Sequence, residues 1–326
     1  MLTKTAHSLY ACTKAYAKDN PWKSWWYILS TTFLLAAAVS GTLAPLPVVA
    51  RTACSILTGL LMVRLFVIYH DQQHRAILPK SRAAAIFMRL LGICFLCPSA
   101  VWRSTHDYHH THNCKLVSAS IGSFPIMTRE QYRQTPAGER FLYLFMRHPL
   151  TILFGYITVF LFGMTILPFF SLPRKNFDSV PAFLLHGAVA TWLVVHFGWL
   201  TLGLTLLLPF FIAGALGAYL FYAQHNFAGV ILKDKEGWTY EGAALESSSH
   251  LKTNPLMAWF TGNIGYHHIH HLNHRVPFYR LPELYRDIPE LRQARTTSLH
   301  PLEILRCLRL KVWCVETQSM VGVRGL

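Results

Sequence analysis

Four long apolar runs constrain this chain more than any other feature. They cover residues 27–48, 52–68, 150–170 and 180–222, and the last is long enough for two helices. A helix needs about 20 apolar residues to cross the hydrocarbon core of a bilayer. Only 14% of the residues are charged, against about a quarter in soluble domains, so too few remain to solvate a globular surface. The sequence predicts an all-α, polytopic membrane bundle of about four spanning helices, with interfacial helices, in a single domain over residues 1–326.

Positive charge follows the apolar runs. The net charge is +15, and the Lys and Arg residues gather between and after these runs. The positive-inside rule places such segments, together with the N-terminus, on the cytoplasmic side. The first run begins only after several lysines and an aromatic cluster at residues 25–27, which is typical of a retained span and not of a cleaved signal. Membrane lipids are therefore the expected partners of this charge, and nucleic acid is not.

The side of the membrane on which each polar segment lies limits the number of crossings. The histidines at 70–74 and at 106–112 lie on the same side of the membrane only if residues 83–100 lie in the interface or re-enter without spanning. A charged residue in this stretch, Arg89, agrees with that placement. Region 149–223 must likewise cross the membrane an even number of times. It holds three candidate spans: the run 150–170 and two halves of the run 180–222, near 181–199 and 200–222. One of these three is therefore expected to lie in the interface or to re-enter without spanning. Glycine and proline make the run 150–170 slightly the weaker helix.

Twelve of the 18 histidines fall in four short clusters near the ends of the apolar runs: His70 and His74; His106, His109, His110 and His112; His225; and His267, His268, His270, His271 and His274. Residues at i and i+3 or i+4 lie on one face of a helix, so each of the three clusters with several histidines presents a pair of imidazoles on one face. The adjacent histidine in two of the clusters points about 100° away around the helix. It therefore suits a second, neighbouring metal, and the spacing predicts a dinuclear centre.

The residue types narrow the choice of metal. Imidazole suits Zn, Cu, Fe and Ni, so ligand type alone leaves these open. A structural zinc site takes four ligands and usually includes cysteine, which does not fit eight or more histidines. Cys94 and Cys97 have metal spacing but lie in an apolar run, and packing is the better interpretation. His186 and His196 could instead pair as haem ligands, although nothing else in the sequence supports haem.

The order and spacing of these clusters resemble a known family. His70-x-x-x-His74, His106-x-x-His109-His110 and His267-x-x-His270-His271 resemble the three histidine boxes of membrane fatty acid desaturases. The residues that flank the third box, and the Gln224–Phe227 segment before it, resemble the bacterial acyl-lipid desaturases. The resemblance implies two iron ions ligated by nine histidines: His70, His74, His106, His109, His110, His225, His267, His270 and His271.

Residues next to these histidines have supporting roles under the same resemblance. His268, His112 and His274 exceed the motif and are expected behind the ligands or at the surface. Asp71 and Asp107 each follow a box histidine and are candidates to accept an imidazole N–H, or are simply solvated or capping carboxylates. We expect apolar residues such as Phe221 and Tyr222 to line a channel for the acyl chain.

The resemblance implies O2-dependent desaturation of acyl chains, which are expected to be linked to membrane lipids. The site is expected in a cytoplasmic, histidine-rich cap of a protein in the bacterial inner membrane. The chain has no nucleotide motif or fused cytochrome module, so electrons are expected from a ferredoxin-like or cytochrome donor that is drawn to the basic surface. Two alternatives remain at this point. One is a di-iron hydroxylase or ketolase of alkyl or carotenoid substrates, and the other is a non-catalytic metal- or haem-binding membrane protein.

Overall fold

The fold begins with a long helical hairpin. The structure is a computed structural model, and it describes residues 6–116, 121 and 123–323. A short helix, α1 (Ala6–Thr13), leads through a 3₁₀ turn (Lys14–Tyr16) to the hairpin of α2 (Pro21–Leu43) and α3 (Val48–Gln73). Asn20 caps α2 by accepting a hydrogen bond from the backbone N–H of Lys23, and Pro21 suits the first helical turn. Both helices are long and apolar enough to cross a membrane.

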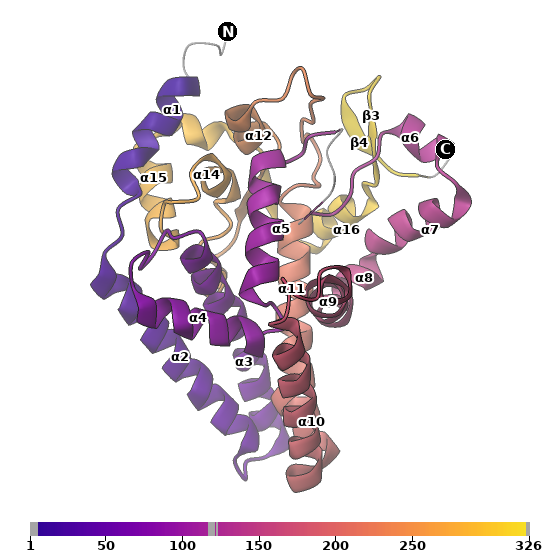
Figure 1. The fold of residues 1–326 in the computed structure, drawn as a ribbon. Helices are drawn as coiled ribbons and strands as arrows, with labels where there is room; N and C mark the ends of the chain where they lie inside the picture. Colours follow the sequence, from indigo (N-terminus) through magenta and orange to yellow (C-terminus); the bar gives the residue numbers. More distant parts are fainter. Residues whose placement is uncertain (1–5, 117–120, 122, 324–326) are drawn as a thin grey trace.

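The stretch from residue 83 to 100 does not cross the bundle. It forms α4 (Arg82–Cys94) and the start of α5 (Ser99–His112), and the two helices meet at a bend of 94°. Leu96, in the bend, has a φ of 55°, in the left-handed region. In Figure 1, α4 lies across α3 while α5 rises away from it. Arg89 on α4 donates two hydrogen bonds to the carboxylate of Asp178, which directly precedes residue 179. These positions agree with the expected interfacial segment.

The third long apolar helix folds back on itself. It covers residues 179–223 and consists of α10 (Ser179–Leu202), a stretch of π-helix, η3 (Gly203–Leu207), and α11 (Leu208–Ala223). Gly198 has a φ of 79° and interrupts the helix. The rings of His186 and Phe210 have centroids 4.9 Å apart, whereas 24 residues of continuous helix would separate them by about 36 Å. The segment is therefore a pair of antiparallel arms, which with α2 and α3 gives four long apolar arms.

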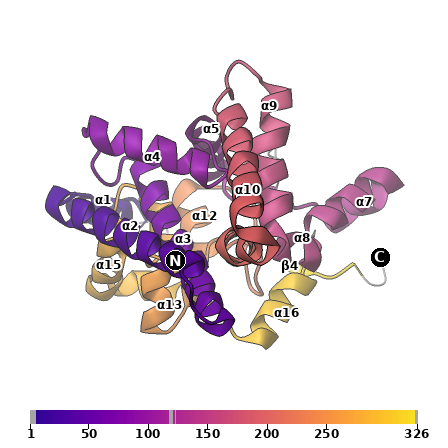
Figure 2. The same ribbon diagram turned by 90° about the horizontal axis from the view of Figure 1, so that it is seen from below.

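The run 150–170 lies across these arms. It forms α8 (Pro149–Leu153), a stretch of π-helix, η2 (Tyr156–Ile166), and α9 (Leu167–Ser171). Its apolar helical part, Tyr156–Ser171, is shorter than a membrane span. Figures 1 and 2 show α9 running roughly perpendicular to α10. The structure thus favours the run 150–170 as the one that does not span, because the later region supplies both arms of a hairpin.

The remaining segments build a cap at the end of the bundle where α3 and α11 terminate (Figure 1). Two short helices of the cap precede the run 150–170: α6 (Arg129–Gln134) and α7 (Ala137–Met146). The other helices of the cap follow α11: α12 (Tyr240–Glu246), α13 (Pro255–Phe260), α14 (His267–Leu272), α15 (Leu281–Asp287) and α16 (Pro301–Arg309). Two 3₁₀ turns, Phe278–Arg280 and Pro289–Gln293, flank α15.

Strands are few and short among the described residues. A parallel pair joins β1 (His250–Lys252) to β2 (Thr296–Ser298), and an antiparallel pair joins β3 (Val312–Cys314) to β4 (Ser319–Val321). Leu251 pairs with Thr297 in the first and Trp313 with Met320 in the second. The predicted all-α membrane bundle is therefore confirmed, with a small strand content confined to the cap.

Two glycines allow η2 to pack closely on α11. A Cβ on Gly155 would lie 2.4 Å from the carbonyl oxygen of Gly214, and a Cβ on Gly214 would lie 2.4 Å from the backbone nitrogen of Tyr156. Backbone atoms cannot move aside as a flexible side chain can, so the two segments would have to separate. This contact holds the transverse segment against the arm that ends beside the histidines.

Gly214→Ala should therefore destabilise the protein by about 1–3 kcal/mol, the usual range for overpacking. The measurement is the thermal unfolding midpoint in detergent. Gly187→Ala is the matched control, because a Cβ there meets no described atom within 4 Å and alanine favours the helix of α10. Equal midpoints for the two variants would show that the close contact is not a constraint.

Candidate metal centre

Four elements bring the predicted histidines to one place in the cap. His70 lies in the last turn of α3 and His74 caps its end. The second box lies on α5, the third box makes up most of α14, and His225 follows the end of α11. The α3 terminus closes through backbone bonds from Arg75 and Ala76, with Arg75 at a φ of 58°. All nine predicted ligands are buried.

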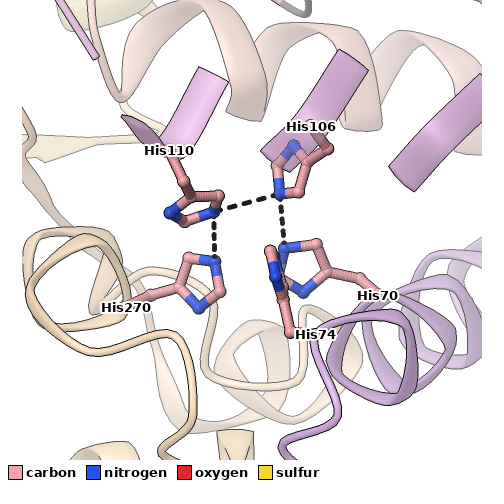
Figure 3. A group of neighbouring side chains, drawn as sticks. All are labelled: His70, His74, His106, His110 and His270. Carbon is pink, nitrogen blue, oxygen red and sulfur yellow. Dashed lines mark hydrogen bonds between the residues drawn. The ribbon is translucent and has the colours of Figure 1, made fainter. Parts of the chain in front are cut away.

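Five of the histidines form one group (Figure 3): His70, His74, His106, His110 and His270. Each offers one ring nitrogen, and these atoms all lie within 4.8 Å of one another. The Nε2 atom of His106 is 2.9 Å from that of His70 and 3.2 Å from that of His110. The Nε2 atom of His270 lies 3.1 Å from that of His110. The group thus collects side chains from α3, α5 and α14.

The other four form a second group: His109, His225, His267 and His271. The Nε2 atom of His225 lies 3.1 Å from that of His109 and 2.9 Å from that of His267. His271 adds its Nε2 atom 3.1 Å from that of His267. The two groups are neighbours, since the rings of His110 and His271 stack with centroids 4.3 Å apart.

Helical spacing explains how adjacent histidines are divided. His106 and His110, at i and i+4, face the five-histidine group, and His267 and His271 share the other group in the same way. The remaining member of each box points around the helix, so His109 joins the four-histidine group and His270 the five-histidine group. The structure therefore brings all nine predicted residues together, and it separates neighbours as a dinuclear arrangement requires.

Hydrogen bonding alone does not account for this arrangement. A ring nitrogen has either one hydrogen or one lone pair, so it makes one good hydrogen bond. Yet the Nε2 atoms of four residues each lie within 3.2 Å of two others: His106, His110, His225 and His267. Two nitrogens bound at right angles to one ion, each at about 2.1 Å, are about 3.0 Å apart. The observed separations suit shared cations.

Burial also keeps these rings in the state that binds metal. Desolvation lowers the pKa of His225 to about 4, and desolvation together with neighbouring histidines lowers the pKa of His267, His270 and His271 well below 6.5. A neutral imidazole retains a lone pair, which is the metal-binding form. The donor set therefore fits two metal ions that accept imidazole ligands.

Residues behind the histidines orient them. The carboxylate of Asp71 lies 3.2 Å from His70 Nδ1 and accepts the backbone N–H of Phe278 at 2.6 Å. The carbonyl of Ser247 lies 3.2 Å from His225 Nδ1. Asp107 is 3.9 Å from His74 Nδ1, which is too long for a hydrogen bond. Of the two aspartates, only Asp71 thus contacts an imidazole in the expected way.

Histidines that exceed the motif lie outside both groups. The ring of His268 is buried and its Nε2 bonds the carbonyl of Leu291. His112 stacks on Tyr108 with centroids 3.9 Å apart. The ring of His274 lies 4.8 Å from that of His74. Of these three, His274 borders predicted ligands, whereas His268 and His112 contact other residues.

The sequence analysis did not single out the aromatic residue that stacks on the second box. The ring of Trp102 lies 4.4 Å from that of His106, with 23° between their planes. Phe66 meets Trp102 edge-on at 5.1 Å, one turn before His70 on α3. The signal was available in the spacing, because Trp102 and His106 are four residues apart and share a helix face.

A hollow borders the four-histidine group. It is lined by His109 and His225 together with Phe221 and Tyr222, the residues expected to line a channel. A second, mostly apolar hollow lies between α3, η2 and α11. Phe66 lines this second hollow and meets Trp102, which stacks on His106. Two aromatic side chains therefore connect the apolar hollow to the five-histidine group.

The remaining candidate residues have other environments. His186 hydrogen-bonds Tyr156, whereas His196 is exposed beside Trp192, so the two do not face each other as haem ligands would. Cys97 is buried in the hydrophobic core and Cys94 is exposed, and both are free thiols. These positions agree with the packing interpretation of the cysteine pair.

Comparison with known proteins assigns the fold and site to a family. The sequence model described as fatty acid desaturase matches residues 45–302. The chain is similar to "Fatty acid desaturase" of Bacillus subtilis (strain 168), with 29% identity over 275 residues that cover 84% of this chain and 78% of the relative. It is also similar to "sn-1 oleoyl-lipid 12-desaturase" of Picosynechococcus sp. (strain ATCC 27264 / PCC 7002 / PR-6), with 24% identity over 279 residues, 83% of this chain and 78% of that relative. This chain belongs to the fatty acid desaturase family of oxidoreductases.

Proposed function

We propose that this protein is an O2-dependent desaturase that uses two iron ions to introduce a double bond into acyl chains linked to membrane lipids. The observation that carries this proposal is the pair of buried groups of five and four imidazoles. A single ion could not use nine ligands, and the two groups are adjacent. We assign the ligands as His70, His74, His106, His110 and His270 for one ion, and His109, His225, His267 and His271 for the other.

Iron is the metal that fits the proposed reaction. When bound, the two ions supply the redox chemistry with which O2 and two electrons remove two hydrogens from neighbouring methylenes. The balance is R–CH2–CH2–R′ + O2 + 2 e⁻ + 2 H⁺ giving R–CH=CH–R′ + 2 H2O. Zinc has no redox chemistry to offer this step, although imidazole would bind it. The electrons come from a separate ferredoxin-like or cytochrome donor.

The chain itself orients the substrate and excludes water. Trp102 covers His106, and Phe221 lies 5.0 Å from the ring of His109. These aromatic side chains give the ligands an apolar border on which an acyl chain can lie. Asp71 and the carbonyl of Ser247 hold His70 and His225 by their outer nitrogens, which keeps Nε2 turned inward. The ring nitrogens would then already be in position to hold the metal ions before substrate arrives.

The substrate assignment follows from where the site lies. The histidines sit at the end of four long apolar arms, so a chain anchored in the bilayer is already close to the groups. One relative is named for action on an oleoyl-lipid, which supports a lipid-linked chain for this protein as well. We place the protein in a bacterial inner membrane with the cap on the cytoplasmic side, where positive charge concentrates.

His270→Ala and His267→Ala should each lower bound iron by roughly half, because each removes an inward nitrogen from a different group. Desaturation should be abolished in both variants. Iron per chain is measured by mass spectrometry of the purified protein, and activity by fatty acid analysis. His300→Asn is the control, since His300 is exposed and caps α16 with a side chain that asparagine can replace. Full iron and full activity in either alanine variant would contradict the ligand assignment.

Expression in a host with only saturated lipids should yield phospholipids whose acyl chains are lighter by two hydrogens. Mass spectrometry of intact lipids from cells fed deuterated saturated fatty acid locates both the loss and the carrier. An acyl chain heavier by one oxygen would instead indicate a hydroxylase, and no change in a strain with reduced donor present would refute the proposed reaction.

A further inference from the structure

Each histidine box carries an exposed arginine beside its metal-binding residues. Arg75 follows His74, Arg103 precedes His106 by three residues, and Arg275 lies just past the third box. We call these three residues the arginine face. They come from the ends of α3 and α14 and from α5, segments that are distant in sequence.

The three arginines lie in the surroundings of His74 and Asp107. Arg75 directly follows His74, and Arg275 directly follows His274, whose ring lies 4.8 Å from that of His74. The Asp107 side chain is 67% exposed and its Oδ1 lies 3.9 Å from His74 Nδ1. Arg103 is tied to the same place by a 2.8 Å bond from its Nε to the Gln73 side chain. The arginine face therefore borders the five-histidine group at His74.

The arginine face carries uncompensated positive charge. Four other arginines of the cap and the interfacial segment have an acidic partner: Arg89, Arg280, Arg286 and Arg306. Within the described part of the chain, no ion pair involves Arg75, Arg103 or Arg275. One aspartate against three arginines leaves a net positive surface, and such surfaces steer acidic proteins to productive encounters.

The route from this surface into the metal-binding group is short. Asp107 borders His74, and the ring of His274, next to Arg275, lies 4.8 Å from His74 and 5.2 Å from His110. Electron transfer through protein slows steeply with distance, so a donor gains by docking where few side chains separate the surface from a ligand. The arginine face combines such a short separation with positive charge.

We propose that the arginine face is the docking surface for a small acidic one-electron carrier protein, which delivers two electrons in successive encounters. This inference rests on the proposed desaturase function. A protein is favoured over the bilayer as occupant because α5 turns 94° away from the interfacial α4 and carries Asp107 out along the cap. The same cap end is opposite the tip of the α2–α3 hairpin (Figure 1).

The test replaces all three residues, Arg75→Gln, Arg103→Gln and Arg275→Gln, in the full-length protein loaded with iron in detergent. The probe is an acidic plant-type ferredoxin. We expect kcat/KM for ferredoxin to fall about tenfold or more at low salt, through a raised KM, and the difference to shrink as ionic strength rises. With photoreduced lumiflavin, a small uncharged reductant, turnover should match the unmodified protein.

A matched variant removes the same charge elsewhere: Arg133→Gln, Arg140→Gln and Arg309→Gln, on α6, α7 and α16. It should retain ferredoxin kinetics. Equal losses in both triple variants, or no loss in the first, would overturn the docking surface. Loss of binding to anionic phospholipid vesicles with unchanged ferredoxin kinetics would assign the arginine face to the membrane instead. Failure of the unmodified protein with lumiflavin as well would refute the proposed function and not the docking alone.

Discussion

Nine buried imidazoles, eight of which bring Nε2 within 3.2 Å of another Nε2, are the constraint on which this fold depends. Protonated, the rings would repel one another, and without a cation their Nε2 atoms are too close for each to be satisfied by hydrogen bonds. Burial counters the first problem, because it lowers the pKa of rings such as those of His225 and His267. Cations held between the rings would resolve the second, and the donor set fits such ions.

The architecture follows from that requirement. Four segments, α3, α5, α14 and the end of α11, terminate or run past one point in the cap, and each contributes to at least one group. The membrane arms bring α3 and α11 side by side, and the transverse run packs against α11 through Gly155 and Gly214. Asp71 then joins the first box to the backbone that follows the third box. The packing of the membrane helices therefore also determines how the histidine side chains are oriented.

Local spacing was sufficient to predict much of the site. Pairs at i and i+4 share a helix face, which identified which histidines act together and why neighbours such as His109 and His110 divide between groups. His268 could be set aside because it exceeds the box motif. The apolar runs predicted the membrane helices for a similar reason, since length and hydropathy are properties of each run alone.

Tertiary geometry could not be obtained in the same way. The length of the run 180–222 predicted two helices, but hydropathy did not identify Gly198 as the residue at which the chain reverses, because the apolar stretch is unbroken there. Asp107 resembles Asp71 in its place after a box histidine, yet only the latter reaches an imidazole, because the facing helix decides the distance. The arginine face likewise could not be predicted, because its three residues are far apart in the sequence and only the fold brings them together.

The late position of α14 has a consequence for how the protein is made. Both groups need this helix: one lacks His270 until it is in place, and the other lacks His267 and His271. Since α14 follows the last apolar arm, neither group can be assembled while the arms are still entering the bilayer. Metal ions that bind these groups would then be loaded after insertion, once the membrane topology of the chain is complete.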